Sequence, residues 1–527
     1  MPPRTLVIQV VACDTTEAMR SAYLSPDPRA DIVELRLDLV RDLHADRLLR
    51  LPGKPKLITV RSRQQGGRAR PADREPLLRR ALTAGVDYID LEFGGQDLQL
   101  LTGPGRSRRI LSYHDFQGTP ADLQGLHREM RAAGGDALLK IVTLADAASD
   151  VLRVRDLLRT AEPGRLVSFC MGPKGVPSRI LARLWESAAV YAPRRGAPGS
   201  APGQVALEDL FEVYRFDRIG PTTRLLGVLG SPIAHSLSPW VHNAALTALG
   251  LDYRYLPFEA GTLAEFLPLL SELRLAGFSV TLPHKETILP HLDALDETAR
   301  RVGAVNTVVK VWNRLEGHNT DVEAALLPLR RRMTLRGARV ALMGAGGAAR
   351  ALVYGLSAEG GRVTLFNRSA GRGRDLARAF GVRHLPWDRL RRFPCDVLIN
   401  ATSVGLAPDA EQSPLPASWI AAPWVYDIVY NPPRTRLLRE ALARGHHIVD
   451  GVEMFVAQAA VQFLLFTGTE APIKLMRETA LRILGHEAPI TGPARPRPRA
   501  AAPARPAKIR PARARPVRRR SRRTRHR

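Results

Sequence analysis

The stretch ALLKIVT, residues 137–143, is an apolar, β-rich run interrupted by one lysine, Lys140. Similar runs recur about every 20–30 residues through the first 215 or so residues, with helix-like segments such as 74–85 and 122–134 between them. The other runs lie at 5–12, 31–37, 56–60, 86–93, 108–114, 165–171 and 187–192. Eight strands alternating with helices predict a parallel (β/α)8 barrel of the TIM type, and a doubly wound sheet is the second interpretation.

The pattern changes after the Gly- and Pro-containing linker DRIGPTTR (217–224). LLGVLGS (225–231) opens a second α/β unit, and RVALMGAGGAAR (339–350) opens a third with a strand, a glycine turn and a helix start. The segment 452–468 has a helical pattern. From about residue 488 the composition is Arg, Pro and Ala, which predicts a disordered tail because proline blocks regular structure and like charges repel.

The chain has 527 residues, of which 45% are hydrophobic. This indicates about three folded domains and excludes a wholly disordered chain. Three cysteines, Cys13, Cys170 and Cys395, exclude a disulfide framework and a Cys-rich zinc module, and we predict no metal site. No apolar run has the roughly 18–20 residues of a membrane helix. The opening MPPRTLVIQV fits neither a signal nor a transit peptide, so we expect a cytoplasmic protein.

The formal net charge of +27 is unevenly distributed. Residues 493–527 hold fourteen Arg and one Lys without Asp or Glu, which leaves +12 for the rest of the chain. A mildly basic folded part suits anionic small-molecule substrates. We interpret the tail as a solvated segment; salt-dependent contact with nucleic-acid phosphates is the less favoured alternative, and no aromatic residue is present for base stacking.

Polar side chains stand at the carboxyl ends of the predicted barrel strands, where such barrels carry their active sites. Burial of Lys140 would lower its pKa and favour a neutral amine that attacks ketones; a structural ion pair is the alternative. His114 on the neighbouring strand is the candidate proton carrier, with Glu92 to orient it. Arginines in this set suit a carboxylated substrate. The other candidates are Glu34, Arg36, Arg61, Arg179, Ser200 and Gln204.

The second unit contains a different set of reactive groups. Ser236 and Ser238 offer two hydroxyls for one carboxylate, and helix capping by Ser238 is the alternative. Lys285 follows a predicted strand, and Asp321 lies in GHNTD (317–321). A lysine–aspartate pair at one alcohol or ketone is a plausible proton relay, although both residue types are common on surfaces.

The third unit has the features of a dinucleotide site. Gly344, Gly346 and Gly347 allow the backbone to approach a pyrophosphate at a helix start, with Ala349 in place of the third glycine. Arg368 ends the next strand, about 20 residues on, where an acid would hold the ribose of NAD. An arginine there favours the 2′-phosphate of NADP.

The barrel half resembles type I 3-dehydroquinate dehydratase over residues 5–215. The motifs are ELRLD (34–38), DLE (90–92), SYHDF (112–116), KIVT (140–143), MGPKGVPSR (171–179) and APGQ (201–204). The resemblance implies a Schiff base on Lys140, proton transfer by His114, orientation of His114 by Glu92, and a carboxylate on Arg179. It implies that Glu34, Arg36, Arg61, Ser200 and Gln204 contact hydroxyls or close the site. One departure is Gln65, where the family usually has glutamate before two glycines.

Residues 225–485 resemble shikimate dehydrogenase, which also has NATSVG (400–405), YDIVYNPPRTRLL (426–438) and GVEMFVAQAAVQF (451–463). This resemblance implies catalysis by Lys285 and Asp321, with Ser236 and Ser238 on the substrate carboxylate. Thr281, Asn306 and Gln458 would bind its hydroxyls, and Tyr430 would lie beside the catalytic pair. Ser279, Ser369 and Leu406 are minor departures. The residues expected to hold NADPH/NADP are Gly344, Ala345, Gly346, Gly347, Ala348, Asn367, Arg368, Ser369, Thr402 and Gly451.

The two halves resemble consecutive steps: dehydration of 3-dehydroquinate, then NADPH-dependent reduction of 3-dehydroshikimate to shikimate. The expected organisation is a barrel over 1–216, a substrate-binding domain over 225–328, an NADP-binding Rossmann domain over 329–450, returning helices over 451–487 and a disordered tail over 488–527. A quinate-type dehydrogenase using NAD, and a regulatory relative with degraded sites, are the alternatives. Arg368 argues against the first, and the intact set Lys140, His114, Lys285 and Asp321 against the second. The sequence indicates no oligomeric state.

Overall fold

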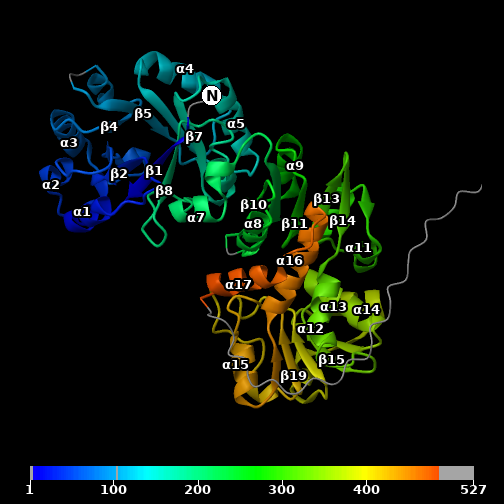
Figure 1. The fold of residues 1–527 in the computed structure, drawn as a ribbon. Helices are drawn as coiled ribbons and strands as arrows, with labels where there is room; N and C mark the ends of the chain where they lie inside the picture. Colours follow the sequence, from blue (N-terminus) through cyan, green and yellow to red (C-terminus); the bar gives the residue numbers. More distant parts are fainter. Residues whose placement is uncertain (1–3, 103–104, 235, 486–527) are drawn as a thin grey trace, which may run out of the picture. The chain divides into compact units, whose positions relative to one another are not determined.

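The computed structural model describes residues 4–102, 105–234 and 236–485. Its first eight strands form one parallel sheet in the order β7-β6-β5-β4-β3-β2-β1-β8 (Figure 1). They are β1 (Leu6–Val11), β2 (Ile32–Arg36), β3 (Lys56–Thr59), β4 (Tyr88–Glu92), β5 (Arg108–His114), β6 (Leu138–Leu144), β7 (Leu166–Met171) and β8 (Ala189–Pro193). Each strand falls on a predicted run, so the (β/α)8 barrel is confirmed and the doubly wound alternative for this half is wrong.

In this sheet β8 pairs with β1, so β7 and β8 are the two end strands of the order. Between β7 and β8, the Ala188 N–H donates to the Leu166 carbonyl at 2.8 Å, just ahead of β8. On β6, Val142 belongs to the cluster inside the barrel, whereas Leu139 and Ile141 pack in a cluster with the surrounding helices. Because side chains alternate along a strand, Lys140 shares the inward direction of Val142.

Helices follow most of the barrel strands. They are α1 (Thr16–Leu24), α2 (Ala45–Leu49), α3 (Pro71–Thr83), α4 (Leu123–Gly134), α5 (Asp150–Thr160), α6 (Val176–Ile180) and α7 (Leu207–Glu212). The helical segments expected at 74–85 and 122–134 are α3 and α4. Between β4 and β5 the chain forms a 3₁₀ helix, η3 (Gln96–Leu100), directly after Gly94 and Gly95, which disfavour a longer helix.

The second sheet is mixed and has the order β10-β9-β11-β13-β14-β12. Its strands are β9 (Arg224–Gly230), β10 (Tyr253–Glu259), β11 (Gly277–Val280), β12 (Ala294–Leu295), β13 (Thr307–Val311) and β14 (Arg314–His318). Its helices are α8 (Ser238–Ala248), α9 (Leu263–Glu272), α10 (His284–Thr287) and α11 (Glu297–Val302). β9 pairs parallel with β10 and β11, and β13 pairs antiparallel with β11 and β14.

The third sheet is wholly parallel, in the order β17-β16-β15-β18-β19-β20. Its strands are β15 (Arg339–Met343), β16 (Arg362–Phe366), β17 (Arg383–Leu385), β18 (Val397–Asn400), β19 (Trp424–Asp427) and β20 (His447–Val449). Its helices are α12 (Asp321–Arg330), α13 (Gly347–Ala358), α14 (Ala370–Phe380) and α15 (Arg436–Ala443). This is the doubly wound order of a Rossmann fold, whose ligand crevice lies where the strand order reverses, between β15 and β18.

Two late helices pack against the second sheet. α16 (Gly451–Thr467) runs beside β11 and β13, and α17 (Ile473–Ile483) packs on α8 (Figure 1). Phe463 and Phe466 of α16 share one buried cluster with Val241 and Tyr255 of that half. The chain therefore returns to the second sheet after completing the third.

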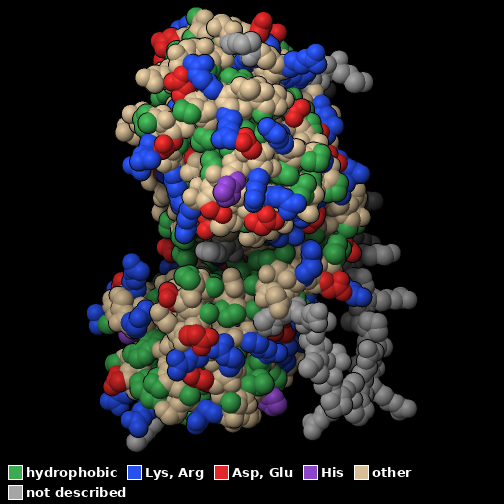
Figure 2. Space-filling model, turned by 90° about the vertical axis from the view of Figure 1, so that its left-hand side faces the viewer, with side chains coloured by type: hydrophobic (Ala, Val, Ile, Leu, Met, Phe, Trp, Pro, Cys, Tyr) green, Lys and Arg blue, Asp and Glu red, His purple; other side chains and the backbone are tan. Residues whose placement is uncertain are grey.

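On the face shown in Figure 2, Lys and Arg side chains are interspersed with Asp and Glu. Among the described residues, no helix combines the length and apolar character needed to span a bilayer. The tail predicted over 488–527 lies outside the described residues.

Candidate active sites

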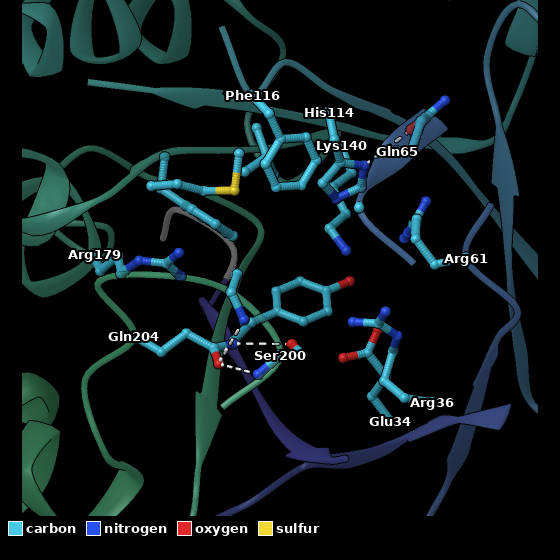
Figure 3. A pocket seen from close by; sticks show the side chains of 16 residues that line it. Glu34, Arg36, Arg61, Gln65, His114, Phe116, Lys140, Arg179, Ser200 and Gln204 are labelled. Carbon is cyan, nitrogen blue, oxygen red and sulfur yellow. Dashed lines mark hydrogen bonds between the residues drawn. The ribbon is translucent and has the colours of Figure 1, made fainter. Parts of the chain in front are cut away.

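A pocket lies at the carboxyl ends of the barrel strands (Figure 3). Eight of the nine predicted barrel residues line it, with apolar Phe116, Phe169 and Tyr191 among the other lining residues. The eight are Glu34, Arg36, Arg61, His114, Lys140, Arg179, Ser200 and Gln204. Gln65 also lines the pocket, although the motifs had given it no role.

Lys140 projects from β6 into this pocket (Figure 3). Its Nζ lies 3.3 Å from Oδ2 of Asp90 and 4.0 Å from the centre of the Tyr191 ring. Burial lowers the pKa of Lys140, and Arg61 acts in the same direction, whereas Asp90 and Glu34 oppose the shift. The net lowering makes the neutral, nucleophilic amine more available.

His114 ends β5 and points into the same pocket (Figure 3). Its Nδ1 lies 3.1 Å from Oε1 of Gln65, and its ring stacks on Phe116 with centroids 6.5 Å apart. Burial lowers the pKa of His114 well below 6.5, and the positive charges of Arg61 and Lys140 lower it further. The imidazole is therefore neutral near pH 7 and can accept a proton.

Glu92, predicted to orient His114, has no hydrogen bond to its ring among the described residues. The Glu92 carboxylate accepts the Ser62 N–H at 2.8 Å and forms ion pairs with Arg61 at 3.5 Å and Arg74 at 3.3 Å. It thus fixes the start of the loop after β3. That loop forms the 3₁₀ helix η2 (Arg63–Gln65), capped by the Ser62 hydroxyl, which brings Gln65 to the imidazole instead.

Arg179 is one of the buried cations of the pocket. Its side chain is 1% exposed and its guanidinium stacks 4.2 Å from the centre of the Phe169 ring. None of its three nitrogens has a hydrogen-bond partner within the described part of the chain. Burial lowers the pKa of Arg179 to about 10. A buried guanidinium without a partner favours an anionic ligand in the pocket it lines.

The remaining barrel candidates are held by neighbours. Arg36 makes a two-bond ion pair with Asp38, both bonds at 2.9 Å. Glu34 accepts the Thr59 hydroxyl at 2.7 Å. In the loop after β8, Gln204 accepts the Ser200 N–H at 2.8 Å and donates to its hydroxyl at 3.3 Å. These contacts position polar groups around Lys140 and leave Arg179 for an anion.

A second site forms where α10 and α12 begin. Nζ of Lys285 lies 2.6 Å from Oδ2 of Asp321, and Nδ2 of Asn306 donates to Oδ1 of Asp321 at 2.8 Å. Asp321 is buried, and Asn306 also donates to the Thr320 hydroxyl at 2.8 Å. The predicted Lys–Asp pair thus exists, with its carboxylate fixed on both oxygens, as a proton relay requires.

The other predicted substrate residues contact neighbours other than the Lys285–Asp321 pair. The Ser236 hydroxyl accepts the Ser238 N–H at 3.3 Å, and α8 begins after Leu237, so helix capping by Ser238 was wrong. Tyr430 packs on Phe455 of α16, with ring centroids 4.7 Å apart. Across the described ranges, no hydrogen bond or ion pair links Lys285 or Asp321 to these residues, which are Ser236, Ser238, Thr281, Tyr430 and Gln458.

The turn between β15 and α13 comprises Gly344, Ala345 and Gly346, and the candidates Gly347 and Ala348 are the first two residues of α13. Gly344 has φ +115°, and a Cβ there would lie 2.7 Å from the Ala401 carbonyl. A Cβ on Gly347 would lie 3.2 Å from Cδ of Lys285. The turn therefore lies beside the catalytic candidate, and its backbone and the α13 N-terminus can receive a pyrophosphate.

The other cofactor candidates flank this turn. Asn367 donates to the Ser369 carbonyl at 2.8 Å, while Arg368 is exposed and has no hydrogen bond or ion pair to any described residue. Thr402 donates to Asn400 at 2.7 Å. Gly451 starts α16 so close to the Ile428 and Val429 carbonyls that a Cβ would lie 2.5 Å from each. A free arginine after β16 fits the 2′-phosphate of NADP.

Comparison with known proteins agrees with this geometry. Residues 6–221 match the family model of type I 3-dehydroquinase, residues 228–308 that of the shikimate dehydrogenase substrate binding domain, and residues 451–481 that of the shikimate 5′-dehydrogenase C-terminal domain.

Three curated relatives extend the comparison. The chain is 36% identical to the bifunctional 3-dehydroquinate dehydratase/shikimate dehydrogenase, chloroplastic, of Arabidopsis thaliana, over 85% of this chain and 79% of that protein. It is 31% identical to the shikimate biosynthesis protein AroDE of Chlamydia pneumoniae, over 83% and 90%. It is 40% identical to the shikimate dehydrogenase (NADP(+)) of Moorella thermoacetica, over 53% and 98%. The chain therefore belongs to the family of bifunctional 3-dehydroquinate dehydratase/shikimate dehydrogenases.

Proposed function

We propose that the barrel pocket dehydrates 3-dehydroquinate to 3-dehydroshikimate, and that the site around Lys285 reduces this product to shikimate with NADPH. Family membership supports both activities. The observation that carries the dehydratase assignment is the pocket itself. Burial favours the uncharged forms of Lys140 and His114, and the guanidinium of Arg179 beside them has no hydrogen-bond partner among the described residues.

In the dehydratase step, Arg179 binds the substrate carboxylate and the Lys140 amine attacks the ketone carbon. The C=O bond breaks, its oxygen leaves as water, and a C=N iminium forms. Nε2 of His114 then removes a proton from the adjacent carbon and later donates it to the leaving hydroxyl, which departs as water. Glu34, Arg36, Arg61, Ser200 and Gln204 orient the substrate hydroxyls. Hydrolysis of the iminium releases the product and restores the amine.

In the reductase step, Lys285 donates a proton to the carbonyl oxygen while that carbon becomes an alcohol carbon. Asp321 holds Lys285 at 2.6 Å and is itself held by Asn306, which keeps the ammonium in place. Ser236 and Ser238 bind the substrate carboxylate. Thr281, Asn306, Tyr430 and Gln458 contact its hydroxyls.

NADPH supplies the hydride when bound. The segment from Gly344 to Ala348 would hold its pyrophosphate, and Asn367, Arg368 and Ser369 would hold its 2′-phosphate. Thr402 and Gly451 would also contact the cofactor. The free guanidinium of Arg368 is the feature that favours NADPH over NADH.

A coupled assay tests both halves: purified protein receives 3-dehydroquinate and NADPH, and shikimate is measured by chromatography. Lys140→Met should abolish shikimate from 3-dehydroquinate but leave reduction of added 3-dehydroshikimate intact. Asp321→Asn should slow the reduction of 3-dehydroshikimate by about 10²–10⁴-fold and leave the dehydration of 3-dehydroquinate intact. Loss of both activities in either variant, with the fold intact, would contradict separate sites.

The domain boundaries given above belong to this proposal, supported by the formation of each sheet from one continuous range. Apart from the tail, limited proteolysis should cut first within 217–224. A cytoplasmic location is supported by Cys13, Cys170 and Cys395 being free thiols, and cell fractionation tests it. No nucleic-acid partner is proposed for the tail: full-length chain and chain ending at Gly492 should bind RNA equally on filters.

A further inference from the structure

Asp90 is a buried carboxylate beside the reacting nitrogen; it opens the DLE motif (90–92), but the sequence analysis assigned it no role. It lies on β4 two residues before Glu92, and its side chain is 0% exposed. Its Oδ2 accepts Nη2 of Arg61 at 2.8 Å and Nζ of Lys140 at 3.3 Å. Its Oδ1 accepts the Ser112 hydroxyl at 2.5 Å.

Arg61 is the closer of the two cations on Oδ2. When Lys140 loses its proton, Asp90 therefore stays paired, and no buried carboxylate is left alone. When the amine forms an iminium, the nitrogen becomes positively charged at the same place. The ketone oxygen of the substrate leaves as water, and this water takes one proton from the amine and one from solvent. Asp90 then faces a cation again.

We infer that Asp90 is the counter-ion of the Lys140 nitrogen: it holds the amine against the Tyr191 ring and stabilises the iminium cation. This inference rests on the Schiff-base function proposed for Lys140. It assigns Asp90 to charge balance at the reacting atom, beyond its ion pair with Arg61.

The groups around Lys140 determine whether its pKa rises or falls when Asp90 is replaced. They are Asp90 from β4, Glu34 from β2, Arg61 after β3, His114 from β5, Tyr191 from β8 and, farther into the pocket, Arg36 and Arg179. Burial lowers the pKa of Lys140, and Asp90 is the main opposing influence. Asp90→Asn removes that influence and leaves Arg61, so the pKa of Lys140 should fall further.

A merely structural role for Asp90 needs a matched control, and Asp97 provides one. Asp97 is also buried, and its carboxylate accepts two hydrogen bonds from Arg74, at 2.6 and 3.1 Å. Asp90→Asn and Asp97→Asn each remove a buried carboxylate from an arginine in the same half of the chain. Only Asp90 touches Lys140.

Competitive acetylation of the full chain across pH 5–10, read by mass spectrometry on the Lys140 peptide, measures the titration of this one amine. Asp90→Asn should move the midpoint down by about one pH unit or more, and Asp97→Asn should leave it at the wild-type value. Dehydration kcat should fall about 100-fold in Asp90→Asn, because the iminium loses its counter-ion. An unchanged midpoint in Asp90→Asn would overturn the inference.

Ser112→Ala provides a second variant should Asp90→Asn not fold. Without the hydroxyl on Oδ1, more of the carboxylate charge acts on Lys140, so the midpoint should move up. A midpoint that stays in place or falls would also overturn the inference. Borohydride treatment of wild-type protein with 3-dehydroquinate distinguishes failure of the proposed function from failure of this inference. Absence of an adduct on Lys140 refutes the Schiff base. An adduct on Lys140, together with titration midpoints that do not move in the variants, refutes only the counter-ion role of Asp90.

Discussion

Oε1 of Gln65 lies 3.1 Å from Nδ1 of His114. The amide nitrogen of Gln65 faces the Phe93 carbonyl at 3.5 Å, which turns the amide oxygen toward the ring. Nδ1 therefore carries the proton, and Nε2 keeps its lone pair for the substrate. An uncharged amide fixes this tautomer without adding the negative charge that would favour imidazolium.

Gln65→Glu should raise the pKa of His114, because a carboxylate beside the ring favours its charged form. The base is active when neutral, so the acid limb of the dehydration profile should move to higher pH and activity near pH 6 should fall. Rates of enone formation from pH 5 to 9 measure this. Leucine cannot accept a hydrogen bond from Nδ1–H, so Gln65→Leu should lower the kcat of dehydration at every pH. An acid limb that stays at its wild-type position in Gln65→Glu would contradict the role of the amide.

Arg179→Met should raise KM for 3-dehydroquinate about 10–100-fold, because a charge-assisted hydrogen bond to the carboxylate is lost. It should not lower Tm, since the variant removes a buried guanidinium that has no protein partner. Arg36→Met is the control: it breaks the ion pair with Asp38 and should lower Tm. Steady-state kinetics and thermal unfolding check both. A lowered Tm with unchanged KM in Arg179→Met would make Arg179 a structural residue.

Arg368→Gln should raise KM for NADPH about tenfold or more and leave KM for NADH nearly unchanged, because only NADPH carries the 2′-phosphate. Arg362→Gln is the matched control, since Arg362 is also exposed and begins the same strand, β16. The measurement is oxidation of either cofactor with 3-dehydroshikimate. Equal losses for the two cofactors would place Arg368 away from the phosphate.

His242 on α8 should make stability depend on pH. Its ring is buried and stacked on Tyr255, with centroids 4.3 Å apart, and burial lowers the pKa of His242 to about 3. Below about pH 6.5 the unfolded chain binds a proton that the folded chain does not take up until about pH 3. This histidine therefore lowers the free energy of unfolding as pH falls through that window, by up to about 1.4 kcal/mol per unit.

His242→Phe keeps an aromatic ring and removes the titration. Urea unfolding at several pH values between 6.5 and 4 should show a smaller loss of stability in this variant than in the wild type. Equal slopes in the two proteins would mean that His242 does not titrate differently on folding.

The sequence predicted the barrel well because each strand is a separate apolar run with polar residues at its carboxyl end, as in ALLKIVT. It placed Lys140, His114 and Arg179 in one pocket because parallel strands end at the same edge. It did not show that Gln65 contacts His114, because sequence spacing does not show which of two neighbouring loops reaches an imidazole. Asp90 was missed for a similar reason: inside IDLEF, an aspartate two positions before Glu92 has no signature until Arg61 and Lys140 meet on it.

The sequence predicted the two residues of the reductase pair, Lys285 and Asp321, but not their contacts. Lys285 and Asp321 come from separate elements, α10 and α12, and only the fold shows that Asn306 holds the second oxygen of Asp321. Ser236 and Ser238 remain sequence-based predictions, because within the described residues neither is hydrogen-bonded to Lys285 or Asp321.

Borohydride reduction of the full chain in the presence of 3-dehydroquinate, followed by peptide mass spectrometry, tests the central claim most directly. The account predicts one covalent adduct, on Lys140, and none in Lys140→Met. Dehydration that continues in Lys140→Met, or wild-type turnover without an adduct on Lys140, would contradict it.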